Sequence, residues 1–108
     1  MEMVWYKNLY TGSLAARKAG SIRKKIAKNQ YPPGVYLVTL PSGEGRLLEI
    51  MAADQLKNVY VRQQVQMIVG LAIGKSEAEY LAAKIVQDTL DAQKDTDVRH
   101  FLEDRDRG

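Results

Sequence analysis

The chain has no cysteine and only one histidine, His100, among its 108 residues. Without cysteine, neither a disulfide nor a thiolate metal site can form, which favours a reducing compartment and predicts a cytoplasmic location. The same scarcity excludes a cysteine–histidine catalytic pair and a histidine-rich metal centre. We therefore expect a protein that is not an enzyme, with no catalytic residue, no metal site and no cofactor.

Long hydrophobic runs are also missing. The longest, residues 67–73, is far shorter than the roughly 20 residues needed to cross a bilayer, so we expect no membrane-spanning role. The first residues contain no basic region leading into an apolar stretch, which argues against a secretory signal. A hydrophobic fraction of 45% is ordinary for a packed core, and predicts a single domain over residues 1–108, with frayed ends at about 1–4 and 103–108.

Acidic side chains are nearly absent from the first thirty residues. This segment carries seven basic residues against Glu2 alone, whereas the other 78 residues carry nine basic and twelve acidic ones. The charge is therefore about +6 in the first segment and −3 in the rest, and the chain is electrically polarised along its length.

The few prolines divide the first half into predicted elements. Residues 14–28 contain no proline and are rich in Ala, Lys and Arg, which predicts a helix that ends before Pro32 and Pro33. Its apolar stripe is formed by Ala15, Ala19, Ile22 and Ile26. Residues 35–40 are β-branched and aromatic, which predicts a strand. A turn at 42–45 allows residues 46–51 to return as its antiparallel partner.

The second half continues with a short helix or turn at residues 52–58 and an extended segment at 59–63. Residues 65–73 are apolar on both alternating faces, which is typical of a central strand. Ser76 and Glu79 have the spacing of a capping box, which predicts a helix from there to about Gln93. We expect its inward residues to be Ala78, Leu81, Ala82, Ile85 and Thr89. One further helical turn is predicted to pack Val98, Phe101 and Leu102 against the body.

Together these elements predict an α+β fold of the order α-β-β-(short helix or turn)-β-α. We expect a small, mostly antiparallel sheet of three strands, or of four, with two helices packed on one face. The other face of such a sheet needs a cover, because the central strand is apolar on both sides. A second copy of the chain would provide it, so we predict a homodimer.

One string has some features of a phosphate-binding loop. Residues 70–76 place glycines and Gly74-Lys75-Ser76 between a strand and a helix, but that motif requires a glycine at position 69, where Val69 stands. A strand that ends before a capped helix explains the string. Gly74, Lys75 and Ser76 remain a candidate site for an anion at the helix N-terminus.

The basic first helix is the strongest functional signal. Arg17, Lys18, Lys24, Lys25 and Lys28 project from it, and the aromatic residues Trp5 and Tyr10 lie just upstream. This combination is able to bind nucleic acid, with the cations on phosphates and an aromatic ring stacked on a base. Two alternatives stay open: the cations are simply solvated or face the acidic second helix, and the aromatic residues pack in the core.

These observations leave three hypotheses of different classes. The first is a non-enzymatic protein-interaction or regulatory module that contacts a protein partner or a second copy of the chain. The alternative is a small nucleic-acid-binding protein that uses the basic helix. The third is a sensor of phosphate or another small anion, with the ligand held at residues 74–76.

Overall fold

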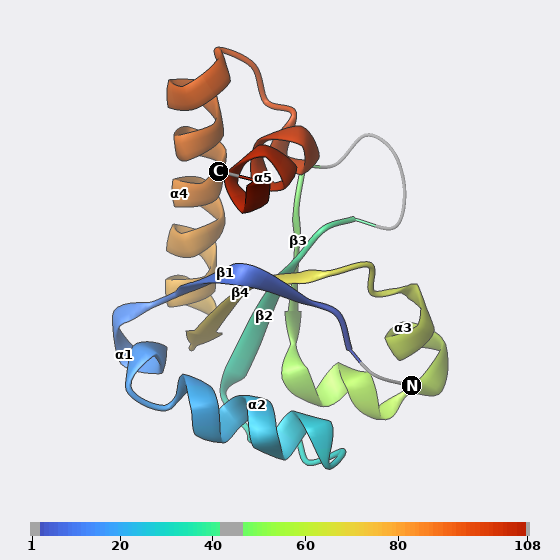
Figure 1. The fold of residues 1–108 in the computed structure, drawn as a ribbon. Coiled ribbons are helices and arrows are strands. Elements are labelled where there is room, and N and C mark those ends of the chain that lie inside the picture. The colour runs from blue at the N-terminus through green and yellow to red at the C-terminus, as the bar shows by residue number, and fades with distance from the viewer. Residues whose placement is uncertain (1–2, 42–46, 108) are drawn as a thin grey trace.

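A four-stranded mixed sheet runs through the middle of the molecule and carries helices on both faces (Figure 1). The computed structural model describes residues 3–41 and 47–107. The strands lie in the order β1-β4-β2-β3, where β1 is parallel to β4 and the other neighbours are antiparallel. The strand bounds are β1 Trp5–Thr11, β2 Val35–Thr39, β3 Glu49–Ala52 and β4 Ile68–Ile73.

The centre of the sheet follows the sequence-based prediction. β4 lies between β1 and β2, and its first five residues are buried, as expected for a strand that is apolar on both faces. β2 and β3 form the predicted antiparallel pair, with Leu37 opposite Met51. The turn that we predicted at 42–45 lies outside the described residues.

β1 is missing from the predicted element order: it is the fourth strand of the sheet, and it forms the one parallel pair of a sheet whose other two pairs are antiparallel. Residues 5–11 pair in parallel with β4, and the register shifts between Trp5 and Tyr10. Tyr6 and Tyr10 pack on one face of the sheet, while Trp5 and Leu9 pack on the other. The exposed Lys7 and Asn8 interrupt the apolar alternation that marks a strand, so the local pattern concealed it.

The predicted first helix is divided into two. α1 covers Ser13–Ala16 and α2 covers Ala19–Ala27, with Lys18 at the break in a non-helical conformation. Ala15, Ile22 and Ile26 of the predicted apolar stripe are nevertheless buried, and Ala19 is partly buried. The stripe packs with residues of β2, β4 and the short 3-10 helix η1 (Ala53–Lys57) in a cluster that includes Ala15, Ile22, Ile26, Leu37, Leu56 and Leu71.

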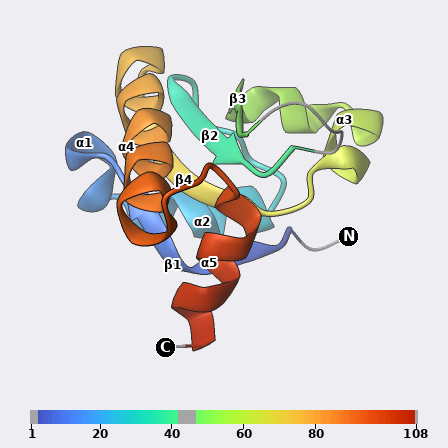
Figure 2. The same ribbon diagram turned by 90° about the horizontal axis from the view of Figure 1, so that it is seen from above.

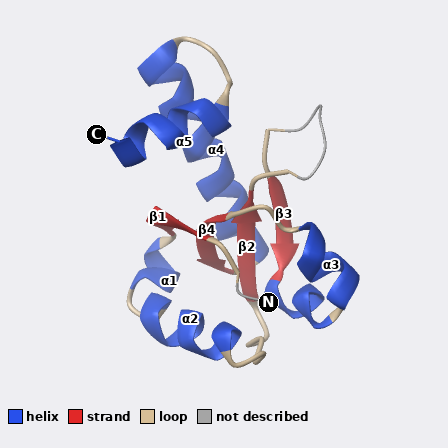
Figure 3. Cartoon of the chain, turned by 45° about the vertical axis from the view of Figure 1, so that its right-hand side comes forward, coloured by secondary structure: helices blue, strands red, loops and turns tan. Residues whose placement is uncertain are grey.

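The opposite face of the sheet is covered by α4 (Lys75–Gln93) and α5 (Val98–Arg107). The inward residues predicted for α4 are confirmed: four of the five are buried, and the partly buried Ala82 packs against the same cluster. Val98, Phe101 and Leu102 of α5 are also buried as predicted, although α5 is longer than the single turn that we expected. In Figure 3, α4 and α5 lie on one side of the strands and α1 and α2 on the other.

The segment predicted to be extended at 59–63 is a helix, α3 (Val59–Gln64). Asn58 initiates it, because the Asn58 side-chain oxygen accepts a hydrogen bond of 2.8 Å from the amide of Tyr60. This cap outweighs the β preference of Val59 and Val61. The neighbouring prediction, a short helix or turn at 52–58, is confirmed by η1.

The arrangement of two helices on one face is therefore wrong, since helices cover both faces (Figure 2). This finding removes the argument for a homodimer, because α1, α2 and η1 bury the face that a second copy was expected to cover. Within residues 3–41 and 47–107, no helix combines the length and apolar character needed to span a bilayer.

Candidate nucleic-acid interface

The cations of the first helix form one exposed surface. Ile22 and Ile26 anchor α2 to the sheet, and the basic side chains of the α1–α2 segment are all exposed. We call this surface the basic face; it consists of Arg17, Lys18, Arg23, Lys24, Lys25 and Lys28. The ion pairs found among the described residues, Lys84–Asp88 and His100–Asp104, involve none of these six cations. The basic face is therefore not neutralised by the described part of the chain.

The acidic helix that was the alternative partner for these cations lies elsewhere. α4 packs on the opposite face of the sheet from α2. Its Asp88 carboxylate lies 3.6 Å from the Lys84 ammonium and accepts a hydrogen bond of 2.9 Å from the Tyr10 hydroxyl. Contact between α2 and α4 within one molecule is thus excluded as the explanation of the basic face.

The two predicted stacking residues have different surroundings. Tyr10 is only 9% exposed and belongs to the core beneath α4, where its hydroxyl is bonded to Asp88. A base has no access to its ring, so Tyr10 does not belong to the interface. Trp5 is half-buried on the other face, and the Arg23 guanidinium carbon lies 4.8 Å from its ring centroid. This cation–π contact joins Trp5 to the basic face.

A cavity of about 400 Å³ opens beside Trp5. We call it the Trp5 cavity. Its lining residues come from the start of β1, the C-terminal end of α2 and α3; they are Met3, Trp5, Ile26, Ala27, Asn29, Tyr31 and Arg62.

Three polar side chains of the Trp5 cavity are bonded to one another. Arg62 Nη1 donates to Asn29 Oδ1 at 3.4 Å and to the Tyr31 hydroxyl oxygen at 3.3 Å. The Tyr31 hydroxyl in turn donates to Asn29 Oδ1 at 3.3 Å. Asn29 has a φ of 60°, a left-handed conformation that asparagine tolerates better than most residues after a helix end.

Of the residues that line this cavity, only Trp5 is a candidate from the sequence. Asn29 carried a local signal, because asparagine after a lysine-rich helix is a common left-handed residue at a helix end. Arg62 carried none, since it lies 33 residues further along the chain, in a segment that we predicted to be extended.

The candidate anion site at Gly74, Lys75 and Ser76 has a carboxylate of the chain beside it. The N-cap of α4 is Gly74, so Ser76 lies inside the helix and the predicted capping box does not form. Glu77 acts instead: its Oε1 accepts a bond of 3.1 Å from the Ile73 amide, and its Oε2 one of 3.2 Å from the Leu14 amide. A ligand anion would meet repulsion from this carboxylate.

Gly12 makes room for that carboxylate. A β-carbon at position 12 would overlap the Oε1, Cδ and Cγ atoms of Glu77. Nothing in the local sequence pattern indicates the bridge from Glu77 to Leu14, because the contact joins residues 63 positions apart.

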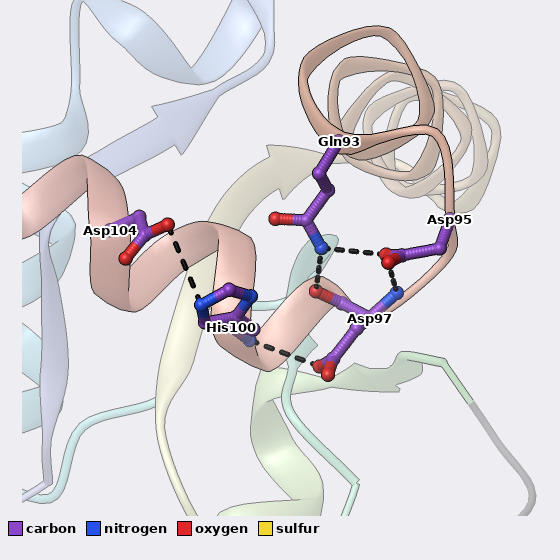
Figure 4. A network of polar contacts seen from close by, with 5 residues as sticks. All are labelled: Gln93, Asp95, Asp97, His100 and Asp104. Atoms are coloured by element: carbon purple, nitrogen blue, oxygen red, sulfur yellow. Dashed lines mark hydrogen bonds and ion pairs between the residues drawn. The ribbon is translucent and has the colours of Figure 1, made fainter.

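Asp95 and Asp97, which precede His100 in the chain, form a helix-capping network (Figure 4). Asp97 Oδ1 accepts from the His100 amide at 3.1 Å, and Asp95 Oδ1 accepts from the Asp97 amide at 3.0 Å and from Gln93 Nε2 at 2.7 Å. The bond from the Asp97 amide, and after it the bond from Gln93, lowers the pKa of the Asp95 carboxyl below its ordinary value.

His100 itself is exposed, with Nε2 3.5 Å from Asp104 Oδ2. Among the described side chains of residues 3–41 and 47–104, no three histidine or carboxylate groups lie close enough together to hold a metal ion. The role of the network in Figure 4 is structural: the bond from Gln93 to the Asp97 carbonyl connects α4 to α5, and the Asp97 carboxylate caps the first turn of α5.

Comparison with known proteins adds no relative to this description. No protein-family model matches the chain, and neither the curated proteins nor the solved structures contain a significant match.

Proposed function

We propose that this protein binds nucleic acid through its basic face, without catalysing a reaction. The observation that carries the proposal is the set of six exposed cations that have no ion-pair partner among the described residues. Lysine and arginine side chains that neutralise phosphates release counterions, which supplies most of the affinity of sequence-independent binding.

The dimensions of α2 suit this role. Its nine residues extend over about 13 Å, at 1.5 Å per residue. Nucleotides of one strand in a duplex follow one another at about 3.4 Å along the axis, so α2 extends along roughly four of them. The cations at both of its ends and along its exposed side are therefore spaced to follow a phosphate backbone.

A salt series with end-labelled 20-nucleotide strands and duplexes of unrelated sequence tests the proposal. If all six cations contact phosphates, the log–log slope of affinity against salt is about −4 for single strands and about −5 for duplex DNA. The triple variant Lys24→Gln/Lys25→Gln/Lys28→Gln is expected to bind more weakly and to reduce these slopes to about −2 and −3.

A matched control uses three lysines associated with α4, which lies on the other face of the sheet. Lys75→Gln/Lys84→Gln/Lys94→Gln removes the same charge and is expected to retain most of the affinity. The proposal is contradicted if no complex forms at about 50 mM salt, where phosphate contacts are strong. Equal losses in the two triple variants would also contradict it, since the effect would then follow net charge alone.

The second candidate is contact with a protein partner, including a second copy of the chain. It is supported by an open apolar groove of about 530 Å³, formed by Leu47, Leu48, Ala82, Ala83, Val86 and Gln87. Grooves of this kind are common in protein interfaces. Sedimentation at micromolar concentration tests the homodimer. A dimer that Val86→Glu dissociates would support it, and a monomeric wild-type protein would exclude it.

A further inference from the structure

We infer that the Trp5 cavity receives one unpaired base of the bound strand, so that the protein prefers single-stranded to duplex nucleic acid. This inference rests on the proposed function and names the form of nucleic acid that the same surface recognises. Four features of the cavity carry it: its size, its aromatic wall, its polar groups and its position relative to Lys28.

The first two features are those of a small-ligand pocket. A volume of about 400 Å³ lies within the range of roughly 300–1,000 Å³ that is typical of such pockets. Met3, Trp5 and Ile26 give it apolar and aromatic walls. Aromatic side chains stack on any base, because every base has a π face, and this is how many proteins hold single strands.

The polar groups match the edge of a base. Arg62 is half-buried and presents a planar guanidinium with five N–H donors, while Asn29 and Tyr31 add a carboxamide and a hydroxyl. Their mutual hydrogen bonds of 3.3–3.4 Å are longer than the 2.7–3.2 Å of ordinary N–H···O bonds and the 2.5–3.0 Å of ordinary O–H···O bonds. Bonds this long are weak, so the three groups can exchange them for shorter ones to the carbonyl and ring nitrogen acceptors of a base.

The position of the cavity connects it to the basic face. Lys28 stands between Ala27 and Asn29, which both line the cavity, and Arg23 lies over the ring of Trp5. We therefore expect a strand whose phosphates lie on Lys24 and Lys28 to pass the cavity opening. A base in a duplex would first have to leave its partner to enter, which costs stacking and pairing energy. A base of a single strand enters without losing a pair, which gives the preference.

Trp5 is the only tryptophan, so its fluorescence reports on the cavity directly. We would titrate the protein with an end-labelled strand of twelve adenine nucleotides, with an abasic strand of equal length and charge, and with a twelve-base-pair duplex. Label anisotropy measures binding, and Trp5 emission measures stacking in the cavity. The adenine strand is expected to bind most tightly and to quench Trp5, whereas the abasic strand and the duplex bind without quenching.

Two conservative variants separate base recognition from charge. Arg62→Lys keeps the charge but loses the planar donors, and is expected to weaken adenine-strand binding by about tenfold while leaving the abasic strand unaffected. Tyr31→Phe removes one hydroxyl and is expected to act in the same direction. Arg99→Lys is the matched control, since Arg99 lies on α5, and it should change neither readout.

The outcomes distinguish this inference from the proposed function. Salt-dependent binding of all three probes with equal affinity and no Trp5 quenching would overturn the cavity as a base site and leave the basic face as the interface. Quenching that Arg62→Lys and Tyr31→Phe both leave unchanged would also overturn it, because the base would then lie elsewhere. Binding of none of the probes would overturn both the inference and the proposed function.

Discussion

Replacing Gly12 with alanine should destabilise the fold through one side chain, Glu77. Gly12 has φ −70° and ψ 162°, a conformation that alanine adopts without strain, so the backbone itself does not require glycine here. The added methyl group would instead overlap the Glu77 carboxylate and its γ-carbon. Glu77 must then move away and give up its hydrogen bonds to the amides of Ile73 and Leu14.

The expected cost follows from those two bonds. Each hydrogen bond to a charged group contributes about 1.5–3 kcal/mol, and the bond to Leu14 belongs at the lower end because it is exposed. Replacement of glycine by alanine offsets about 0.4–1 kcal/mol of this loss, because alanine lowers the conformational entropy of the unfolded chain. We therefore expect Gly12→Ala to lower the free energy of unfolding by about 2–4 kcal/mol, a large part of the roughly 5–15 kcal/mol of a typical domain.

A double-mutant cycle tests this reasoning by urea unfolding. In the Glu77→Ala background the new methyl group meets no carboxylate, so Gly12→Ala should there be neutral or stabilising by about 0.4–1 kcal/mol. With a slope of about 2 kcal/mol per molar urea, the single Gly12→Ala variant should lower the unfolding midpoint by about 1–2 M. An equal loss in both backgrounds would refute the explanation.

Two further predictions concern the sheet and the capping network. Gly70→Ala should cost about 1–3 kcal/mol in thermal unfolding, because its β-carbon would lie 2.9 Å from Leu81 Cδ2, and Leu81→Ala should reduce that cost. Gln93→Ala should raise the pKa of Asp95 toward its ordinary value, measured from the carboxyl ¹³C shift. The lowered pKa of Asp95 means that the folded state favours the ionised carboxylate. The Asp95 carboxylate therefore stabilises the fold above about pH 4, and this stabilisation is lost as the pH falls through the folded-state pKa. An Asp95 pKa that Gln93→Ala leaves unchanged would contradict this assignment.

Local pattern was sufficient for some elements and misleading for others. β4 was predictable because its residues are apolar on both faces without interruption, and α4 because its apolar residues follow the helical period over 19 residues. Residues 59–63 were not, because the β preference of two valines was outweighed by the cap that Asn58 provides. β1 was missed because its partner β4 lies some 60 residues away, and a parallel pairing at that distance leaves no local signal beyond an interrupted alternation.

The candidate site divides in the same way. The basic face lies within twelve residues of sequence, so composition and helical period were enough to find it. The Trp5 cavity draws on the start of β1, the end of α2 and the middle of α3, and only tertiary packing brings them together. Its polar residues are also ordinary at their positions: Asn29 and Tyr31 follow a helix end, Arg62 lies 31 residues beyond Tyr31, and nothing in the sequence indicates that the three share a site.

The correction to the fold bears directly on function. The apolar central strand required cover on both faces, and that requirement was sound, but the first helix supplies the cover rather than a second molecule. Placing α2 there separates its cations from the acidic residues of α4, which remain on the opposite face. Like charges gathered without a partner repel one another, so an exposed cluster of this kind costs stability unless a partner uses it. The packing that makes the second copy unnecessary thus also leaves the basic face available to a polyanion from outside the molecule.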